Sequence, residues 1–384
     1  MKNRKVLLVL VVVALCLSLV IPAVAAGLRT VKLDAVYRDI KIYLYGEEFT
    51  PKDVNGKVVE PFIVDGTTYV PLRAISEAFD LDVYWDSSTS SIHIEDYDES
   101  RYPDPPSPPS NKVEVSTAEE LVKAIAPDTC ITLKAGKYDL SKVAGVDNPF
   151  THWEYDHYYD TDSKTLVIDE LEGLTLQAAS GADVEIVTPW RFAQVLMFEN
   201  CNGISLFGIK AGHTITGDYE CDAGVLYFRN TDNIIIEDCF LFGSGTIGIE
   251  LYNCRVAEVI NTTVTDCSRR AVHVDYSFDV TFDECKFIDN RAYQGVIFSE
   301  NSSVEFYDCV ITGNKSLEDP VVISDNSLFV SCVFRDNAHI QEGSSWPVIS
   351  GQWVQLRDCE IEKGNYSRYW EAGYVNDLGG NKLK

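Results

Sequence analysis

Six short stretches in the C-terminal half of the chain repeat one pattern: apolar, any residue, apolar, two polar residues, and then a small residue that is usually Cys. They are IIIEDC (234–239), VAEVIN (256–261), VTFDEC (280–285), VEFYDC (304–309), LFVSC (328–332) and VQLRDC (354–359). Their last positions are spaced by 22, 24, 24, 23 and 27 residues. Such a period is typical of one coil of a solenoid, whose coils bury their inner faces against one another. The β-branched alternation favours strands, so the pattern predicts a right-handed parallel β-helix.

The first 25 residues are typical of a bacterial export signal, residues 1–25 forming a signal peptide. Lys2, Arg4 and Lys5 precede an apolar run over 6–20, and Ala23-Val24-Ala25 provides a small-residue cleavage site. No later stretch is long and apolar enough to span a bilayer. We therefore expect a secreted or cell-surface protein, with a short uncleaved anchor as the alternative.

The chain is strongly acidic. Its 59 Asp and Glu outnumber 32 Lys and Arg, and removing the three signal-peptide cations takes the net charge from −27 to −30. This surface argues against nucleic acid as a partner and permits cations or neutral and basic partners. An extracellular polysaccharide or a cell-envelope component is the partner that we expect, and the composition does not indicate an oligomeric state.

Cysteine is abundant for an exported chain and occupies the repeat. One of the 11 cysteines, Cys16, lies in the signal peptide, and five of the others end repeat units at one-coil spacing. Small apolar residues stacked inside a solenoid explain that placement, so we expect mostly free, buried thiols. One or more disulfides are the alternative, and the state of Cys201, Cys221 and Cys254 stays open. No CxxC pair occurs, which argues against a structural zinc site.

A small α/β module is expected over residues 31–95, with a helix over 71–79. The string PFIVDGTTYVPLRAISEAFDLDVYWDSSTSSIHI (61–94) resembles the copper amine oxidase-like N-terminal domain, a stalk module found on many exported bacterial proteins. The resemblance does not imply amine oxidation, since the chain lacks the motifs for that enzyme's quinone and copper ligands. Arg73 is interpreted as a structural residue. Residues 96–112 hold five prolines between Pro103 and Pro109, which indicates a semi-rigid linker.

Residues 113–384 are predicted to form a β-helix of about ten coils. Ser116 and Glu119 form a capping box for a short helix whose apolar face would close the first coil. The first coil is expected at 130–140, and Ala179 and Ile209 continue the column that ends in the cysteines. Longer steps there indicate insertions near 188–194 and 214–223. The segment resembles the pectin lyase-like superfamily, and this resemblance implies the fold more strongly than any chemistry.

A second strand can be placed in each coil, and its alternation predicts which side chains face solvent. The strands are VLYFRN (225–230), GIELYN (248–253), AVHVDYS (271–277) and GVIFSEN (295–301). Alternation directs Val296 and Phe298 inward in the last of them. The predicted outward side chains are Tyr227, Arg229, Glu250, Tyr252, His273, Asp275, Ile297 and Ser299.

This outward surface is the candidate site. Tyr227, Arg229 and Tyr252 are candidate sugar-binding residues, while His273 is a candidate acid or base between Glu250 and Asp275. The alternative is an ordinary solvated strand surface. Lyases of the superfamily use Arg or Lys as base near Ca²⁺, so the resemblance makes Arg269 and Arg270 candidate catalytic residues. The chain lacks recognisable pectate lyase signatures and the polygalacturonase Asp-Asp and Gly-His-Gly motifs.

Two acidic insertions complete the candidates. Asp218, Glu220 and Asp222 could hold Ca²⁺, which prefers oxygen ligands; the alternative is a solvated acidic loop. The stretch THWEYDHYYD (151–160) has the residues to bind a metal or stack on sugars, or to pack over an early coil.

Three functions remain open. The chain is interpreted first as a non-catalytic surface protein with a glycan- or protein-binding face. The alternatives are a polysaccharide lyase or glycoside hydrolase, and a structural envelope protein. An enzyme requires converging carboxylates and a base in one groove, whereas a binding protein requires only the aromatic and polar face.

Overall fold

The computed structural model describes residues 35–44, 47–51, 58–64, 66–77, 81–86, 91–96, 105–155, 163–215, 223–243, 246–341, 344–371 and 375–384. The proposed signal peptide, Cys221 and the candidate calcium ligands Asp218, Glu220 and Asp222 lie outside these residues. No helix in the described part of the chain is long and apolar enough to cross a membrane. The chain divides into two compact units, Met1–Phe79 and Asp80–Lys384.

In its described residues, the first unit consists of short antiparallel strands and one helix. β1 (Ile42–Leu44) pairs with β2 (Glu47–Phe49), and β3 (Phe62–Val64) pairs with β4 (Thr67–Tyr69). The helix α2 (Leu72–Glu77) lies within the expected range of 71–79. A hairpin of β5 (Leu81–Asp86) and β6 (Ser91–Asp96) falls in the second unit. The division therefore falls inside the 31–95 module that the sequence suggests.

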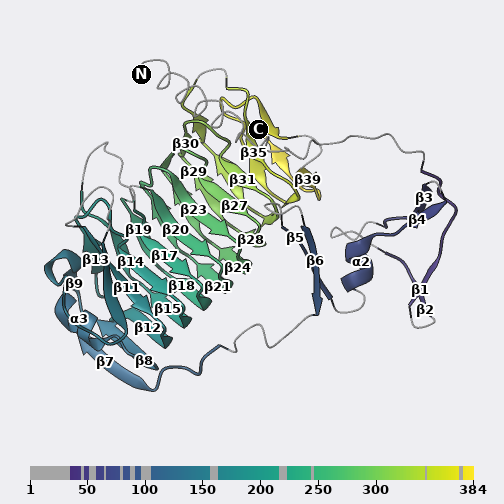
Figure 1. The fold of residues 1–384 in the computed structure, drawn as a ribbon. Helices are drawn as coiled ribbons and strands as arrows, with labels where there is room; N and C mark the ends of the chain where they lie inside the picture. The colour runs from purple at the N-terminus through teal and green to yellow at the C-terminus, as the bar shows by residue number, and fades with distance from the viewer. Residues whose placement is uncertain are drawn as a thin grey trace, which may run out of the picture. The chain divides into compact units, whose positions relative to one another are not determined.

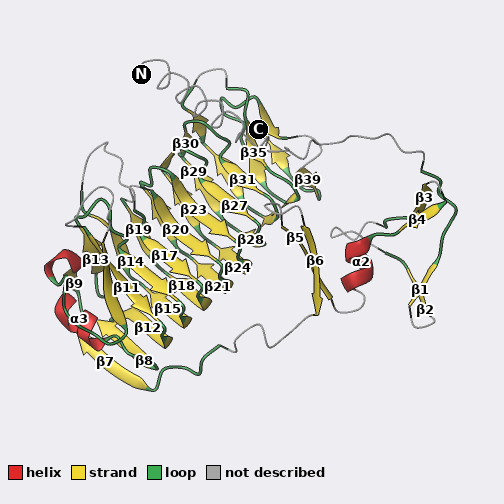
Figure 2. Cartoon of the chain, in the orientation of Figure 1, coloured by secondary structure: helices red, strands yellow, loops and turns green. Residues whose placement is uncertain are grey.

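Three long sheets form the β-helix, and all their strands pair in parallel except β10 with β11 (Figures 1 and 2). Sheet 1 contains β10 (Thr151–Tyr155), β11 (Lys164–Asp169), β14 (Leu196–Glu199), β17 (Leu226–Arg229), β20 (Ile247–Tyr252), β23 (Arg270–Asp275), β27 (Ile297–Glu300), β31 (Val322–Ser324), β35 (Pro347–Ser350) and β38 (Arg368–Trp370). Sheet 2 contains β7 (Asn111–Val115), β8 (Thr129–Leu133), β12 (Glu172–Ala178), β15 (Asn202–Phe207), β18 (Asp232–Glu237), β21 (Arg255–Ile260), β24 (Phe278–Asp283), β28 (Val304–Tyr307), β32 (Ser327–Val330), β36 (Val354–Arg357) and β39 (Val375–Asp377).

Sheet 3 contains β9 (Gly136–Asp139), β13 (Val184–Thr188), β16 (Lys210–His213), β19 (Phe240–Phe242), β22 (Thr263–Thr265), β25 (Lys286–Ile288), β29 (Val310–Thr312), β33 (Val333–Arg335), β37 (Glu360–Ile361) and β40 (Lys382–Leu383). A small fourth sheet joins β26 (Arg291–Ala292), β30 (Lys315–Ser316) and β34 (Ala338–His339). The chain visits sheets 1, 2 and 3 in turn, and the ten strands of sheet 3 mark ten coils in the described residues. The predicted parallel β-helix is confirmed.

Stacked side chains of one kind fill the interior. The rings of Phe282, Phe306 and Phe329 lie face to face, with centroids 5.0 and 4.5 Å apart. Cys239, Cys285, Cys309, Cys332 and Cys359 are at most 3% exposed. The nine cysteines in the described residues are all free and buried. Burial raises the pKa of the Cys239 thiol to about 12, which keeps it protonated.

The small-residue column includes Thr262 rather than Asn261. Strand pairing places Ala257 beside Val280, so Thr262 aligns with Cys285, and the steps from Cys239 become 23 and 23. Thr262 is 1% exposed, and its Oγ1 accepts the backbone N–H of Cys239 at 3.3 Å. Asn261 lies one residue earlier, in an exposed turn with φ of 43°. The sequence motif was shifted by one because Val256 is apolar like its true counterpart Ala257.

A helix closes the first coil, with its cap one residue later than expected. In α3 (Ala118–Ala124) the N-cap is Thr117, which accepts the N–H of Glu120 at 3.2 Å. The Glu120 carboxylate in turn accepts the N–H of Ser116 at 2.7 Å. The expected pair of Ser116 and Glu119 is therefore wrong, although the apolar face is buried as predicted: Leu121, Val122 and Ile125.

The last part of the linker is held against sheet 2. Pro106 lies so close to Gly203 that a Cβ on that glycine would come 1.9 Å from the proline Cγ. The Ser110 N–H donates to Asp128 at 2.7 Å, and β7 begins at Asn111. Residues from 105 onward therefore belong to the β-helix rather than to a free spacer.

Candidate functional site

Sheet 1 exposes two columns of side chains over four consecutive coils. Parallel pairing aligns Tyr227, Glu250, His273 and Phe298 in one column and Arg229, Tyr252, Asp275 and Glu300 in the other. The alternate residues of β17, β20 and β23 point inward and are 0% exposed: Leu226, Phe228, Ile249, Leu251, Val272 and Val274. We call the eight outward residues the outward face. Six of them are the residues that the sequence predicted.

In the fourth coil, the side chains expected to point outward point inward, and their neighbours point outward instead. Ile297 and Ser299 are 0% and 3% exposed and point inward, whereas Phe298 and Glu300 join the outward face. The step from Asp275 to Glu300 is 25 residues, one more than the alignment of 272 with 296 assumed. A one-residue shift in a strand exchanges its two faces. The turn that precedes β27, which includes Tyr293, contains the additional residue.

His273 lies between a carboxylate and an aromatic ring. Its Nδ1 is 3.2 Å from Oε1 of Glu250, and both side chains are about one-fifth exposed (20% and 21%). On its other side, the ring meets Phe298 edge to face, with centroids 5.3 Å apart. A carboxylate that orients an imidazole is the arrangement used in general acid–base catalysis, and it equally fixes a hydrogen-bonding group for a ligand.

The two adjacent arginines differ in environment. Arg269 is exposed, and its Nε and Nη2 donate to Oε1 of Gln294 at 3.1 and 3.0 Å. Arg270 begins β23 and is 8% exposed, and its guanidinium carbon lies 3.9 Å from the centre of the Phe298 ring. Burial, followed by the charge of Arg269, lowers the pKa of Arg270 to about 10. Arg270 therefore packs on Phe298 of the outward face, whereas Arg269 is bonded to the same Gln294 from the exposed side.

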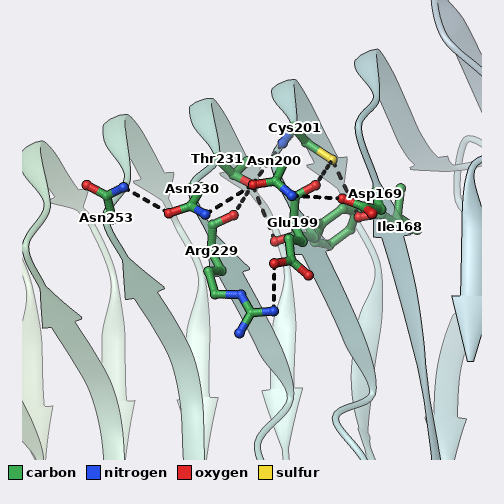
Figure 3. A network of polar contacts seen from close by, with 10 residues as sticks. Ile168, Asp169, Glu199, Asn200, Cys201, Arg229, Asn230, Thr231 and Asn253 are labelled. Carbon is green, nitrogen blue, oxygen red and sulfur yellow. Dashed lines mark hydrogen bonds and ion pairs between the residues drawn. The ribbon is translucent and has the colours of Figure 1, made fainter. Parts of the chain in front are cut away.

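Arg229 is paired within the protein. Its Nη2 lies 2.6 Å from Oε1 of Glu199, a residue of β14 in the preceding coil (Figure 3). The Glu199 carboxylate holds the pKa of Arg229 above its usual range. Because this cation is already neutralised, it is a poor candidate for binding a charged ligand, contrary to the role that the sequence suggested.

Asparagines stack along the turn beside this ion pair. The side-chain amide of Asn253 donates to Asn230 at 2.8 Å, that of Asn230 to Asn200 at 3.0 Å, and that of Asn200 to Asp169 at 3.0 Å (Figure 3). The three asparagines have φ between 49° and 52°, a region that Asn tolerates better than most residues. The turn that follows the outward face is thus held in one conformation from coil to coil.

Carboxylates continue the second column beyond the arginine. Burial raises the pKa of Asp275, and burial together with the charge of Asp275 raises the pKa of Glu300. The pKa of Asp325, one coil further, is raised by burial and by Asp275. Oδ1 of Asp275 is buried without a hydrogen-bond partner. This part of the face therefore holds negative charge that is incompletely compensated.

Aromatic rings flank the charged groups. Tyr252 is 40% exposed, and its ring lies edge to face with Tyr276 at 5.9 Å. Tyr227 is partly buried, and burial followed by Glu250 raises its pKa to about 12. Tyr252 therefore offers the most accessible of these rings for stacking, whereas Tyr227 and Phe298 are partly buried.

The other candidate positions lie away from the outward face or among residues that the structure does not describe. In the described residues, no group of three His, Cys, Asp or Glu side chains is arranged to hold a metal. From the stretch 151–160, residues 151–155 form β10, which pairs antiparallel with β11 and so packs on an early coil. A shallow depression on sheet 2 is remote from the candidate catalytic residues and is lined by Val256, Glu258, Asp279, Val280, Thr281, Ser303 and Glu305.

Sequence reasoning missed four residues that complete the site: Glu199, Gln294, Phe298 and Glu300. Phe298 and Glu300 were missed through the shift in β27. Gln294 lies in the turn before that strand, and no motif marks it. Glu199 could have been found, because it lies 30 residues before Arg229, the same coil length that separates Ile209 from Cys239.

Two family models match the chain. Residues 29–100 match the copper amine oxidase N-terminal domain, and residues 223–383 match the right handed beta helix region. None of the curated proteins matches the sequence. The chain thus carries both kinds of domain, and the structure extends the β-helix N-terminally to β7, which pairs parallel with β8.

Similar solved structures include enzymes and an adhesin. A pectate lyase is 10% identical with a TM-score of 0.42, and 71% of this chain and 79% of that chain are covered. An alginate lyase from Paenibacillus is 12% identical with a TM-score of 0.38, and 70% of this chain and 99% of that chain are covered. A surface adhesin of Streptococcus pneumoniae is 10% identical with a TM-score of 0.39, and 69% of this chain and 68% of that chain are covered. At these values the likenesses assign no activity to this chain.

Proposed function

We propose that this chain, a copper amine oxidase N-terminal domain followed by a right-handed β-helix, is an exported or cell-surface protein that binds a glycan. The outward face of sheet 1 is the binding surface, and the N-terminal domain serves as a stalk without amine oxidase activity. The observation that carries this proposal is the alignment of aromatic, acidic and basic side chains across four coils. Rings for stacking beside fixed polar groups are what a sugar-binding surface needs.

The contacts favour binding over catalysis. Arg229 is neutralised by Glu199, and both Arg269 and Arg270 donate to Gln294. These groups are held in place, which suits recognition of a ligand of fixed shape. A purely structural envelope protein, the third alternative, would not need such a face.

A polysaccharide lyase or hydrolase is the second candidate. It is favoured by the contact of His273 with Glu250 and by the lowered pKa of Arg270, since perturbed groups in one place are typical of active sites. Under this alternative His273 or Arg270 would act as the base, and a nearby carboxyl group, such as that of Asp275 or Glu300, would act as the acid. Calcium, if required, would enter from solution.

A glycan array, run with and without Ca²⁺ and scored for both retention and chain cleavage, separates these functions. We expect retention without cleavage. Tyr252→Ala and Phe298→Ala should each weaken retention about fivefold, because each ring–sugar contact contributes about 1 kcal/mol. Tyr307→Ala is the matched control, since Tyr307 is a partly exposed tyrosine on sheet 2.

His273→Ala distinguishes the second candidate. If the protein cleaves a glycan, this variant should lose turnover while retention persists. Retention of no glycan by the full-length protein, under either condition, would refute the proposed function.

A further inference from the structure

Arg270 carries a buried positive charge that no carboxylate neutralises at close range. Its Nη2 donates to Oε1 of Gln294 at 3.2 Å and its Nε to the Gln294 carbonyl at 3.5 Å. One face of the guanidinium lies on Phe298. No Asp or Glu oxygen of the described residues lies within 4.0 Å of it, and Nη1 has no acceptor among them. A charge that is only 8% exposed and unpaired is costly, and an anionic ligand group would offset that cost.

Acidic groups surround this cation without reaching it. Glu250, Asp275, Glu300 and Asp319 all interact electrostatically with Arg270. Burial raises the pKa of the last three, so their negative charges are also incompletely stabilised. Cation and anions thus lie beside one another, yet they remain separate instead of forming ion pairs.

A ligand of one sign does not match this arrangement. A polyanionic chain would meet four carboxylates, and a purely cationic sugar would meet the buried guanidinium. Each mismatch places like charges together in a poorly solvated region, where repulsion is stronger than in water. A ligand that carries both signs satisfies both sets of groups.

We propose that the outward face binds a zwitterionic amino sugar, one that carries a carboxylate for Arg270 and a free ammonium group for the surrounding acids. Its ring would stack on Phe298 or Tyr252. This inference rests on the proposed glycan binding and specifies the class of sugar that the same face selects.

Four amino sugars with the same glucosamine ring but different charged groups test the inference with the full-length protein. Muramic acid carries both charges, N-acetylmuramic acid only the carboxylate, glucosamine only the ammonium group, and N-acetylglucosamine neither. Titrations followed by NMR or calorimetry should show muramic acid bound about fivefold or more tightly than each of the others. Alanine, a zwitterion without a sugar ring, should bind more weakly than muramic acid.

Two substitutions assign the charges. Arg270→Gln should remove the protein's preference for muramic acid over glucosamine. Glu300→Gln should reduce the protein's preference for muramic acid over N-acetylmuramic acid. Arg270→Lys keeps the charge and guards against misfolding of the buried variant, and it should retain part of the preference. Glu305→Gln is the control, because Glu305 lies on sheet 2 and is exposed, as Glu300 is. It removes the same charge and should change neither preference.

The outcomes separate the two proposals. Equal affinity for the four sugars, or for alanine and muramic acid, would show that the zwitterion is not what the face recognises, while glycan binding would stand. The same conclusion follows if the array retains glycans but none of the four sugars binds. If neither the array nor the four sugars show binding, the proposed function itself fails.

Discussion

Val256 has a backbone conformation that β-branched residues rarely adopt. Its φ is 53°, and strand pairing aligns it with Asn233 and Asp279, which have φ of 54° and 57°. Earlier coils have Gly173 and Gly203 at the same position. A left-handed residue is therefore required here in each of these coils, and Val256 is the poorest fit because its branched Cβ crowds the backbone.

Val256→Asn should raise the free energy of unfolding by about 1 kcal/mol, because Asn tolerates the left-handed region. Chemical denaturation measures the change. Gly203→Ala is the opposite case and should destabilise, since its φ is 73° and the new Cβ would clash with Pro106. A Val256→Asn protein that is less stable than the wild type would contradict the assignment of strain to this residue.

Asp275 is expected to reduce stability at neutral pH. Its pKa is raised by burial, so folding disfavours the ionised form, and the wild type should gain stability as pH falls through the raised pKa towards the unfolded value near 3.8. Asp275→Asn should therefore be more stable than the wild type at pH 7, with a difference that shrinks towards pH 4. Denaturation at both pH values checks this, and a constant difference would argue against the raised pKa.

Buried asparagines link the coils at the corner between sheets 3 and 1. Asn290, Asn314 and Asn337 are 0%, 0% and 3% exposed. The Asn314 side chain accepts the backbone and side-chain N–H groups of Asn290, both at 2.9 Å, and donates to the Phe287 carbonyl at 2.8 Å. A buried polar column of this kind stabilises only while every member keeps its partners.

Asn314→Ala should lower the free energy of unfolding by about 2 kcal/mol or more, because it leaves the buried backbone N–H of Asn290 without an acceptor and the Phe287 carbonyl without the donor amide of Asn314. Asn230→Gly removes an amide from the exposed stack of Figure 3 and keeps the left-handed turn accessible, so it should cost less than about 1 kcal/mol. Equal losses in the two variants, measured by denaturation, would show that burial does not set the difference.

The whole chain should be separable at the linker. Limited proteolysis is expected to release a stable C-terminal fragment that begins before or close to Pro106, because Pro106 packs on Gly203 and Ser110 is bonded to Asp128. Mass spectrometry of the fragments identifies the cut. Cleavage within the β-helix that occurs earlier than cleavage at the linker would contradict the two-part organisation.

The fold followed from the sequence because solenoid coils repeat. The cysteine spacing and the strand alternation are local properties, so they predicted the stack and six residues of the outward face without long-range information. The errors at Asn261, Ser116 and Phe298 are all shifts of a residue or so. The error at Phe298 arises because the turn before β27 holds an additional residue, which periodicity cannot locate. Those at Asn261 and Ser116 arise because an adjacent residue of similar type fits the pattern equally well.

Composition and spacing thus established an acidic chain with a linker, a β-helix and a column of buried cysteines. The chemistry of the face depended on the packed chain. Whether Arg270 is buried on Phe298 and whether Arg229 is neutralised by Glu199 are set by neighbours 28 and 30 residues away. The packed chain likewise decides that Oδ1 of Asp275 is left without a hydrogen-bond partner. Charge and solvation are properties of that assembled environment, so the same residue types carry different pKa values and roles in adjacent coils.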